Sequence, residues 1–189
     1  MKREQLEHVL RAASHVVGDA EILVIGSQAI LGAIAEDRLP PAATASMEVD
    51  VAFFDDPDDL KADQVDGAIG ELSPFHEKFG YYAQGVSVST ATLPAGWRDR
   101  LVLVDTASTH PGRGYLLDPY DCVVSKLVAG REKDLAFATA LLEAGLIDPA
   151  LLAQRVDMLD IAPALLQRLR NWIGTFGDSA PAETDGTTA

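Results

Sequence analysis

The chain has a single cysteine and few positive charges. One cysteine, Cys122, excludes an internal disulfide framework and a multi-cysteine zinc site, and its apolar surroundings favour a buried structural thiol. Only 15 Lys and Arg face 29 Asp and Glu, which gives a formal net charge of −14. Non-specific binding to DNA needs clustered basic residues, so this composition argues against it. An anionic substrate must instead meet local positive charge or a divalent metal.

The chain also lacks a long apolar run. No stretch approaches the roughly 20 apolar residues that cross a bilayer, because charged residues interrupt each hydrophobic segment first. The N-terminus, with Lys2, Arg3 and Glu4, has no uninterrupted apolar segment of the kind found in secretion signals. We therefore expect a cytoplasmic protein with no membrane partner. Its 189 residues, 48% of them hydrophobic, can fill the core of one domain.

The first half of the chain predicts alternating helices and strands. Apolar residues at helical spacing indicate an amphipathic helix that closes near Gly18, and residues 21–25 form a short buried strand. A Gly26-Ser27 turn separates this strand from an apolar helix over residues 28–35.

Proline and acidic residues mark the next boundaries. Residues 39–46 are predicted to be a loop and residues 47–54 a strand. The acidic turn Asp55-Asp56-Pro57-Asp58-Asp59 lacks the mid-loop Gly and terminal Glu of a calcium loop, so we expect it to cap a helix that ends near Leu72. Residues 86–90 and 100–104 are predicted to extend the sheet.

The second half is predicted to be helical from Asp118 onward. Asp118-Pro119 and Asp148-Pro149 each combine an N-cap carboxylate with proline at the first helical position. Helices are expected at about 119–129, 132–144, 149–156 and 161–174. The pattern predicts an α/β (α+β) fold with a mixed sheet flanked by helices and a C-terminal helical bundle. We divide it into a core over 1–110, a helical part over 111–176 and a disordered tail over 177–189.

Three groups of residues are candidates for chemistry. Gly26 and Ser27 open a helix, where free amides can bind phosphate, although Gly-Ser is also a common turn. Glu48 and Asp50 are two apart on a strand, so both carboxylates point to one face. Such a pair fits a divalent cation, but an edge position or a basic neighbour would also explain it.

The third group combines a buried-looking lysine with a basic turn. Lys126 stands in an otherwise apolar helix, so its ammonium is expected to emerge into a cleft. Gly130 marks a bend, and Asp134 in the next helix would neighbour Lys126 or Arg131. A structural ion pair between two helices explains the same residues equally well.

Together these motifs resemble a known family. The segments Val-Ile-Gly-Ser-Gln-Ala-Ile from Val24, Glu-Val-Asp from Glu48, and Ser-Lys-Leu-Val-Ala-Gly-Arg-Glu-Lys-Asp from Ser125 are similar to the nucleotidyltransferase-like proteins of the DUF6036 type. These in turn resemble the nucleotidyltransferase toxins of the AbiEii and MenT kind. The resemblance spans about residues 20–150 and implies a nucleotidyltransferase-like fold.

The resemblance also implies a reaction and a set of roles. It implies a Mg²⁺-dependent transfer of a nucleoside monophosphate from a nucleoside triphosphate to an RNA, protein or small-molecule acceptor. The implied roles are phosphate binding for Gly26 and Ser27, metal ligation for Glu48 and Asp50, positive charge near the triphosphate for Lys126 and Arg131, and a further carboxylate or a group orienting Lys126 for Asp134.

The sequence departs from the family pattern at two places. Glu48 stands where the family's strand pair usually begins with Asp. The third carboxylate of active sites of this type is missing from the expected strand, where Ser87 and Ser89 stand instead, and Asp105 is a more distant candidate for it. These departures keep a second function open. The protein would then be a weak or inactive member of the fold that binds a nucleotide or a protein partner, in a homodimer or a toxin-antitoxin-like pair.

Overall fold

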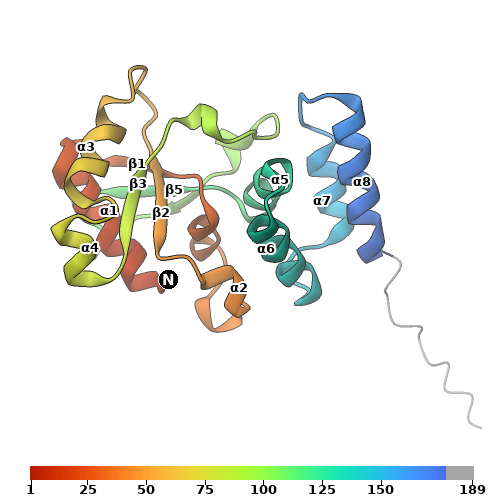
Figure 1. Ribbon diagram of the computed structural model, residues 1–189, viewed down its shortest axis with the longest axis horizontal. Coiled ribbons are helices and arrows are strands. Elements are labelled where there is room, and N and C mark those ends of the chain that lie inside the picture. Colours follow the sequence, from red (N-terminus) through yellow and green to blue (C-terminus); the bar gives the residue numbers. More distant parts are fainter. Residues whose placement is uncertain (178–189) are drawn as a thin grey trace, which may run out of the picture.

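A five-stranded mixed sheet lies at the centre of the protein. The computed structural model describes residues 1–177, and the strands stand in the order β3-β2-β1-β5-β4. Their bounds are Glu21–Val24 for β1, Glu48–Ala52 for β2, Tyr82–Gly85 for β3, Val102–Val104 for β4 and Arg113–Leu116 for β5. β1 is antiparallel to β2 and parallel to β5, so the sheet is mixed. The predicted α/β class with flanking helices is confirmed (Figure 1).

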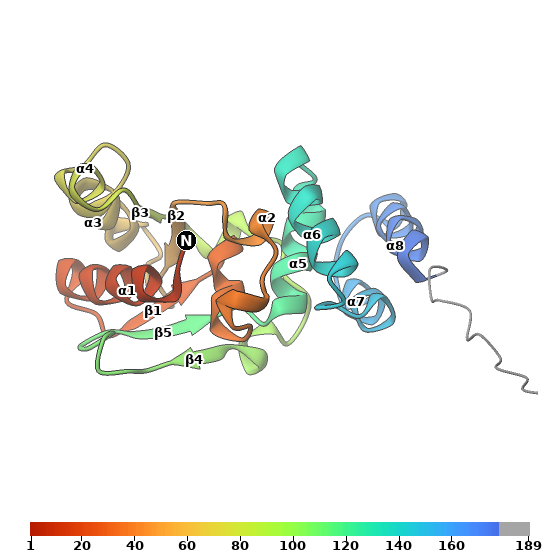
Figure 2. The same cartoon turned by 90° about the horizontal axis from the view of Figure 1, so that it is seen from below.

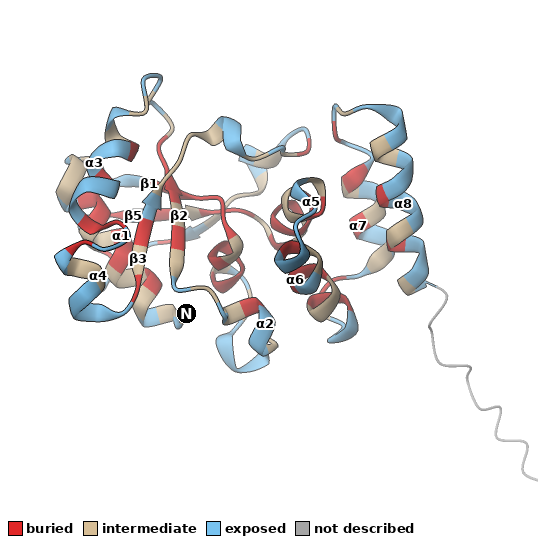
Figure 3. Cartoon of the chain, viewed as in Figure 1, coloured by how far each residue is buried: buried red, intermediate tan, exposed pale blue. Residues whose placement is uncertain are grey.

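Helices near the N-terminus cover the sheet. α1 (Arg3–Val17) packs on β1, β5 and α3 (Leu60–Ile69), and α4 (Pro74–Phe79) packs beside α3 and β3. α1 buries one apolar stripe and ends at Gly18 with a left-handed backbone, as its pattern predicts. Figure 3 shows the buried residues on the strands and on the inner faces of these helices.

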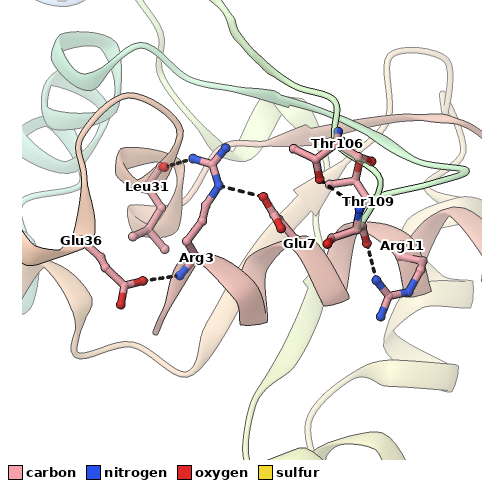
Figure 4. Close-up of polar contacts among 8 residues, drawn as sticks. Arg3, Glu7, Arg11, Leu31, Glu36, Thr106 and Thr109 are labelled. Atoms are coloured by element: carbon pink, nitrogen blue, oxygen red, sulfur yellow. Dashed lines mark hydrogen bonds and ion pairs between the residues drawn. The ribbon is translucent and has the colours of Figure 1, made fainter.

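Polar contacts fix α1 against two distant segments. The backbone amide of Arg3 donates to Glu36 (2.7 Å), and its guanidinium pairs with Glu7 (3.2 Å) and donates to the carbonyl of Leu31. Further along α1, the side chain of Arg11 donates to the carbonyl of Ser108 (Figure 4). These contacts hold the segment that follows β1 in place beside the sheet.

The C-terminal helices form a bundle on one side of the sheet (Figures 1 and 2). They are α5 (Pro119–Ala129), α6 (Glu132–Glu143), α7 (Pro149–Val156) and α8 (Pro163–Gly177), so the four predicted helices are confirmed. The side chains of Asp118 and Asp148 accept from backbone amides of the first turns, at 3.0 and 2.8 Å. Gly177, which was assigned to the disordered tail, is helical in α8, and the remainder of that predicted tail lies outside the described residues.

A buried carboxylate links this bundle to the sheet. Asp121 of α5 is fully buried and accepts from the Arg100 guanidinium at 2.9 and 3.2 Å, while Arg155 of α7 lies 3.3 Å from it. The two arginines offset only part of the cost of burying this carboxylate, since burial raises the pKa of Asp121 to about 6 although Arg100 lowers it.

Two segments near the site differ from the prediction. The helix expected at 28–35 is a 3-10 helix over Ser27–Gly32, where a Cβ on Gly32 would lie 2.8 Å from Leu116 and so prevent close packing on β5. The loop expected at 39–46 contains a short helix, α2 (Pro41–Thr44), with proline in its first turn.

The acidic turn caps a helix, as predicted, but the helix is shorter than expected. Asp56 accepts from the amides of Lys61 (3.0 Å) and Ala62 (3.0 Å), so capping is confirmed. α3 nevertheless begins at Leu60, after Asp59 has taken a left-handed backbone, and ends at Ile69 instead of near Leu72.

One strand was predicted in the wrong place, and another was missed. The strand expected at 86–90 is a 3-10 turn over Val88–Thr90, because the Ser87 hydroxyl accepts from the Ser89 amide, and β3 ends just before it. β5 lies within the part assigned to the C-terminal helices, so the sheet continues past residue 110. A Cβ on Gly114 would lie 2.6 Å from Leu10, so this glycine lets α1 approach the strand.

None of the helices in residues 1–177 is long and apolar enough to span a bilayer.

Candidate functional site

The paired carboxylates of β2 face a polar cavity. Val49 and Val51 are fully buried on the opposite face of the strand, while Glu48 and Asp50 alternate with them and are partly exposed. Both carboxylates line a cavity of about 450 Å³. Its other lining residues come mainly from β3, from the segment that follows β3 and from α5: Ile25, Gln84, Val86, Thr90, Ala91, Thr92, Ser125, Lys126, Val128, Ala129 and Arg131.

The charge of Asp50 is unfavourable in this setting. Burial raises the pKa of Asp50 to about 6, the nearby ammonium of Lys126 counteracts the shift, and the Glu48 carboxylate adds to it. Lys133 lowers the same pKa from further away. The pair therefore has local cationic neighbours, but they do not fully offset the cost of two adjacent carboxylates.

Tyr82 holds the first carboxylate from the neighbouring strand. β3 runs parallel to β2, with Tyr82 opposite Glu48 and Gln84 opposite Asp50. The hydroxyl of Tyr82 donates to Oε2 of Glu48 at 3.1 Å. Burial raises the pKa of Tyr82 to about 12, and the Glu48 carboxylate raises it as well, so the hydroxyl stays protonated and remains a donor.

Lys126, Arg131 and Asp134 come together at the mouth of the cavity. Asp134 is almost fully buried, lies 2.6 Å from Nε of Arg131 and 3.7 Å from Nζ of Lys126, and thereby holds both cations. The Lys126 side chain is only 13% exposed, whereas the Arg131 side chain is 57% exposed. The ion pair expected between two helices is present, and its two cations, but not Asp134, line the cavity.

Gly26 is required by Asp50 itself. A Cβ on Gly26 would lie 1.7 Å from Oδ2 of Asp50, so the carboxylate occupies the space that a side chain would need. On the other side of this turn, the Cys122 thiol donates to the Gly26 carbonyl at 3.5 Å, and burial raises the thiol pKa to about 12. The expectation of a buried structural thiol is confirmed.

A second cavity of about 260 Å³ adjoins the first. It shares Glu48 and Lys126 with it, and Ser27 lines it. The remaining lining residues are Ala42, Ala45, Ser46, Lys133, Asp134 and Phe137. The residues selected from the sequence thus line two neighbouring cavities, except for Gly26, which contacts Asp50 and lines neither of them.

The donor set fits a magnesium ion. Mg²⁺ is commonly held by one or two carboxylates together with substrate phosphates and water, and Glu48 and Asp50 provide that pair. Residues 1–177 contain no group of three His, Cys, Asp or Glu side chains arranged to hold a metal. Asp105 is too far away to be a third metal ligand beside this pair. It forms an ion pair with Arg113 (3.3 Å), and Arg113 is opposite Glu21, at the end of β1 that lies away from Gly26. Ser87 follows β3 and is not part of that strand.

Three site residues were missed in the sequence. Gln84 and Tyr82 stand opposite the carboxylate pair, but the strand that carries them was predicted four residues too late. Lys133 belongs to a recognised basic stretch, yet only the fold places it in the second cavity. The one sequence signal for this strand is Gly85, because a glycine in or at the end of a strand often marks a close backbone approach. In the structure a Cβ on Gly85 would lie 2.0 Å from a backbone oxygen of α3.

Comparison with known proteins identifies the family. No curated protein and no solved structure matches the chain. The sequence model of one family, described as "Nucleotidyltransferase of unknown function", matches residues 4–168, which include every residue of the two cavities. The chain therefore belongs to the DUF6036 family of nucleotidyltransferases of unknown function.

Proposed function

We propose that the protein is a Mg²⁺-dependent nucleotidyltransferase that moves a nucleoside monophosphate from a nucleoside triphosphate to an acceptor. The observation that carries this proposal is the convergence of Glu48 and Asp50 with Lys126 and Arg131 on one polar cavity. Paired carboxylates next to two cations suit a metal-bound polyphosphate, because the carboxylates bind the metal ion and the cations bind the phosphate oxygens. Membership of a family described as nucleotidyltransferases supports the general class.

The residues of the chain would bind and orient the donor. Lys126 and Arg131 would donate to phosphate oxygens, and Asp134 would keep both side chains in place at 3.7 and 2.6 Å. Glu48, held by Tyr82, and Asp50 would hold Mg²⁺. When bound, Mg²⁺ would polarise the phosphoryl group and neutralise developing negative charge.

The transfer itself is a substitution at the α-phosphorus. A hydroxyl oxygen of the acceptor forms a bond to that phosphorus and releases its proton to water, while the bond to the bridging oxygen of the β-phosphate breaks and pyrophosphate leaves. The acceptor is an RNA end, a protein hydroxyl or a small molecule. A net charge of −14 disfavours an acceptor recruited by non-specific attraction to phosphates.

Ligand-dependent stability tests donor binding. Thermal unfolding with Mg²⁺ and each nucleoside triphosphate should show stabilisation for at least one nucleotide, since a ligand at 100 times its Kd adds about 2.7 kcal/mol. Incubation with the labelled nucleotide and pools of RNA, protein and small hydroxyl compounds should then show transfer. Transfer should disappear in Asp50→Asn and persist in Asp58→Asn, which changes the net charge equally in an acidic turn outside both cavities. Absence of any nucleotide-induced shift would sink the proposal.

One observation favours a second function. Gln84 stands opposite Asp50, and β3, with the sequence Tyr-Ala-Gln-Gly, carries no third carboxylate beside the pair. A site with two carboxylates would bind a nucleotide and Mg²⁺ without turning it over, in a protein that serves as a binding module within a homodimer or a toxin-antitoxin-like pair. Binding without transfer in the wild type, and transfer gained in Gln84→Asp, would favour this second function over the first.

A further inference from the structure

A hydroxyl-rich segment forms one wall of the first cavity. Residues 86–92, with the sequence Val-Ser-Val-Ser-Thr-Ala-Thr, follow β3 and contain four hydroxyl side chains. Val86, Thr90, Ala91 and Thr92 of this segment line the cavity, together with the carboxylate pair of β2 and the two cations. Hydroxyl side chains therefore share one cavity with the groups that would hold a nucleotide and Mg²⁺.

Backbone contacts on both sides hold this segment over the cavity. At its start, the amide of Val86 donates to the carbonyl of Val51 in β2 at 2.9 Å. Beyond its end, the amide of Ala95 donates to the carbonyl of Met158, just after α7, also at 2.9 Å. Figure 1 shows the segment, in light green, running from the sheet toward the C-terminal helices. Thr92 is thus held between two fixed points, one on the sheet and one on the helical bundle.

Thr92 has the available hydroxyl of this wall. The Thr90 hydroxyl donates to the carbonyl of Ser87 at 2.7 Å, and the hydroxyls of Ser87 and Ser89, neither of which lines the cavity, bond to each other at 2.9 Å. The other lining hydroxyl, that of Ser125, belongs to a half-buried residue within α5. Thr92 is exposed, lies outside any helix or strand, and its hydroxyl makes no hydrogen bond within residues 1–177.

An acceptor inside the chain suits the charge of this protein. A net charge of −14 disfavours the recruitment of an anionic acceptor from solution. A hydroxyl on the wall of the cavity needs no recruitment. Reactants that are held together in one cavity react in an effectively unimolecular step, which removes much of the entropic cost of bringing them together.

We propose that the protein nucleotidylylates itself and that Thr92 is the modified residue. The inference rests on the proposed function and names an acceptor for it. Oγ1 of Thr92 forms a bond to the α-phosphorus and releases its proton to water, while the bond to the bridging oxygen of the β-phosphate breaks and pyrophosphate leaves. The nucleoside monophosphate then remains in the cavity as a phosphodiester of Thr92. Because it occupies the donor site, the modified chain binds no second nucleotide.

Incubation without any added acceptor tests the proposal. The purified protein, MgCl₂ and each labelled nucleoside triphosphate should give one label per chain with at least one nucleotide, at a rate per molecule that does not depend on protein concentration. Peptide mass spectrometry should place the label on Thr92. Thr92→Ala removes the nucleophile and should abolish labelling, whereas Thr92→Ser should retain it. Ser89→Ala is the matched control, because it removes an exposed hydroxyl of the same segment that does not line the cavity, and it should label like the wild type.

Thermal unfolding of the variants separates a nucleophile from a binding residue. Thr92→Ala should keep the stabilisation that the nucleotide and Mg²⁺ give to the wild type, because its cavity still binds the donor. Loss of this stabilisation together with the label would make Thr92 a binding residue and overturn the assignment. Labelling that persists in Thr92→Ala, or that maps to Thr90 or Ser125, would overturn it as well. A rate per molecule that rises with protein concentration would refute transfer within one chain.

The outcomes also separate this inference from the proposed function. A wild type that transfers a nucleoside monophosphate to an added acceptor but does not label itself would overturn the inference and leave the proposed function standing. A wild type that binds no nucleoside triphosphate would reject the proposed function, and the inference with it.

Discussion

Replacing Asp50 with Asn is expected to stabilise the metal-free protein at neutral pH. Burial raises the pKa of Asp50 from 3.8 to about 6 in the folded protein. The folded state therefore holds this proton more tightly than the unfolded state, and its stability falls as the pH rises from about 4 to about 6. A difference of about two pKa units corresponds to at most about 3 kcal/mol at pH 7.5, since water still reaches the carboxylate. Asn removes the ionisation and most of this cost.

Thermal unfolding in a chelating buffer measures the effect. For a chain of this size each kcal/mol shifts Tm by about 2 to 4 °C, so Asp50→Asn should melt up to about 10 °C higher than the wild type at pH 7.5. The gain should shrink toward pH 4, where the wild-type carboxyl is protonated. Asp58→Asn controls for the change in net charge and should shift Tm by no more than a degree or two. A variant that melts at or below the wild-type temperature at pH 7.5, or whose advantage persists unchanged at pH 4, would refute the reasoning.

Three further predictions concern single contacts. Asp121→Ala removes both the charge and the acceptor oxygens that Arg100 and Arg155 contact, and should lower the free energy of unfolding by about 3 to 5 kcal/mol. Asp157→Ala, in an exposed pair, should cost less than about 1 kcal/mol, and equal costs in urea unfolding would contradict the buried-pair argument. Gly26→Ala should displace the carboxylate of Asp50 and weaken Mg²⁺ binding about tenfold or more, with little change in the free energy of unfolding. Undiminished Mg²⁺ binding in calorimetry would be inconsistent with the close contact. Tyr82→Phe removes the hydroxyl bonded to the glutamate of the pair and should weaken Mg²⁺ binding several-fold without altering nucleoside binding; an equal loss for both ligands would indicate general disruption of the site.

The C-terminal helices could be predicted because their signals are local. Asp118 and Asp148 each precede a proline, and both side chains accept hydrogen bonds within the next three residues. Gly130 adopts a left-handed backbone at the end of α5, as a glycine after a helix predicts. These signals depend only on neighbours in the chain, so the fold does not change their meaning.

The strands β3 and β5 could not be located in the same way. Gly114 has the appearance of a turn residue, yet it is a strand residue that makes room for Leu10 of α1. Ser87 lies among β-branched residues that favour a strand, but its hydroxyl caps a turn. The deciding contact of Gly114 is with a residue distant in sequence, and that of Ser87 is between a side chain and the nearby backbone. Neither kind of contact leaves a periodic pattern in the sequence.

The residues of the candidate site also differ in whether a local sequence pattern predicts them. Alternation along one strand was enough to predict that Glu48 and Asp50 share a face, and an isolated lysine in an apolar helix indicated that Lys126 opens into a cleft. Gln84 and Lys133 reach the site only through strand pairing and through the packing of α6 beside α2, so no local pattern identifies them.

The contact between Gly26 and Asp50 shows why two separate motifs belong to one unit. The resemblance implies phosphate binding for Gly26, whereas in the structure the position of its missing Cβ faces the Asp50 carboxylate. The turn after β1 and the acid pair on β2 are antiparallel neighbours, and the Ile25 amide donates to the Asp50 carbonyl at 3.1 Å. A side chain at position 26 would push that carboxylate toward Lys126 and the cavity. The glycine therefore positions the carboxylate relative to the cations, and the two motifs can change only together.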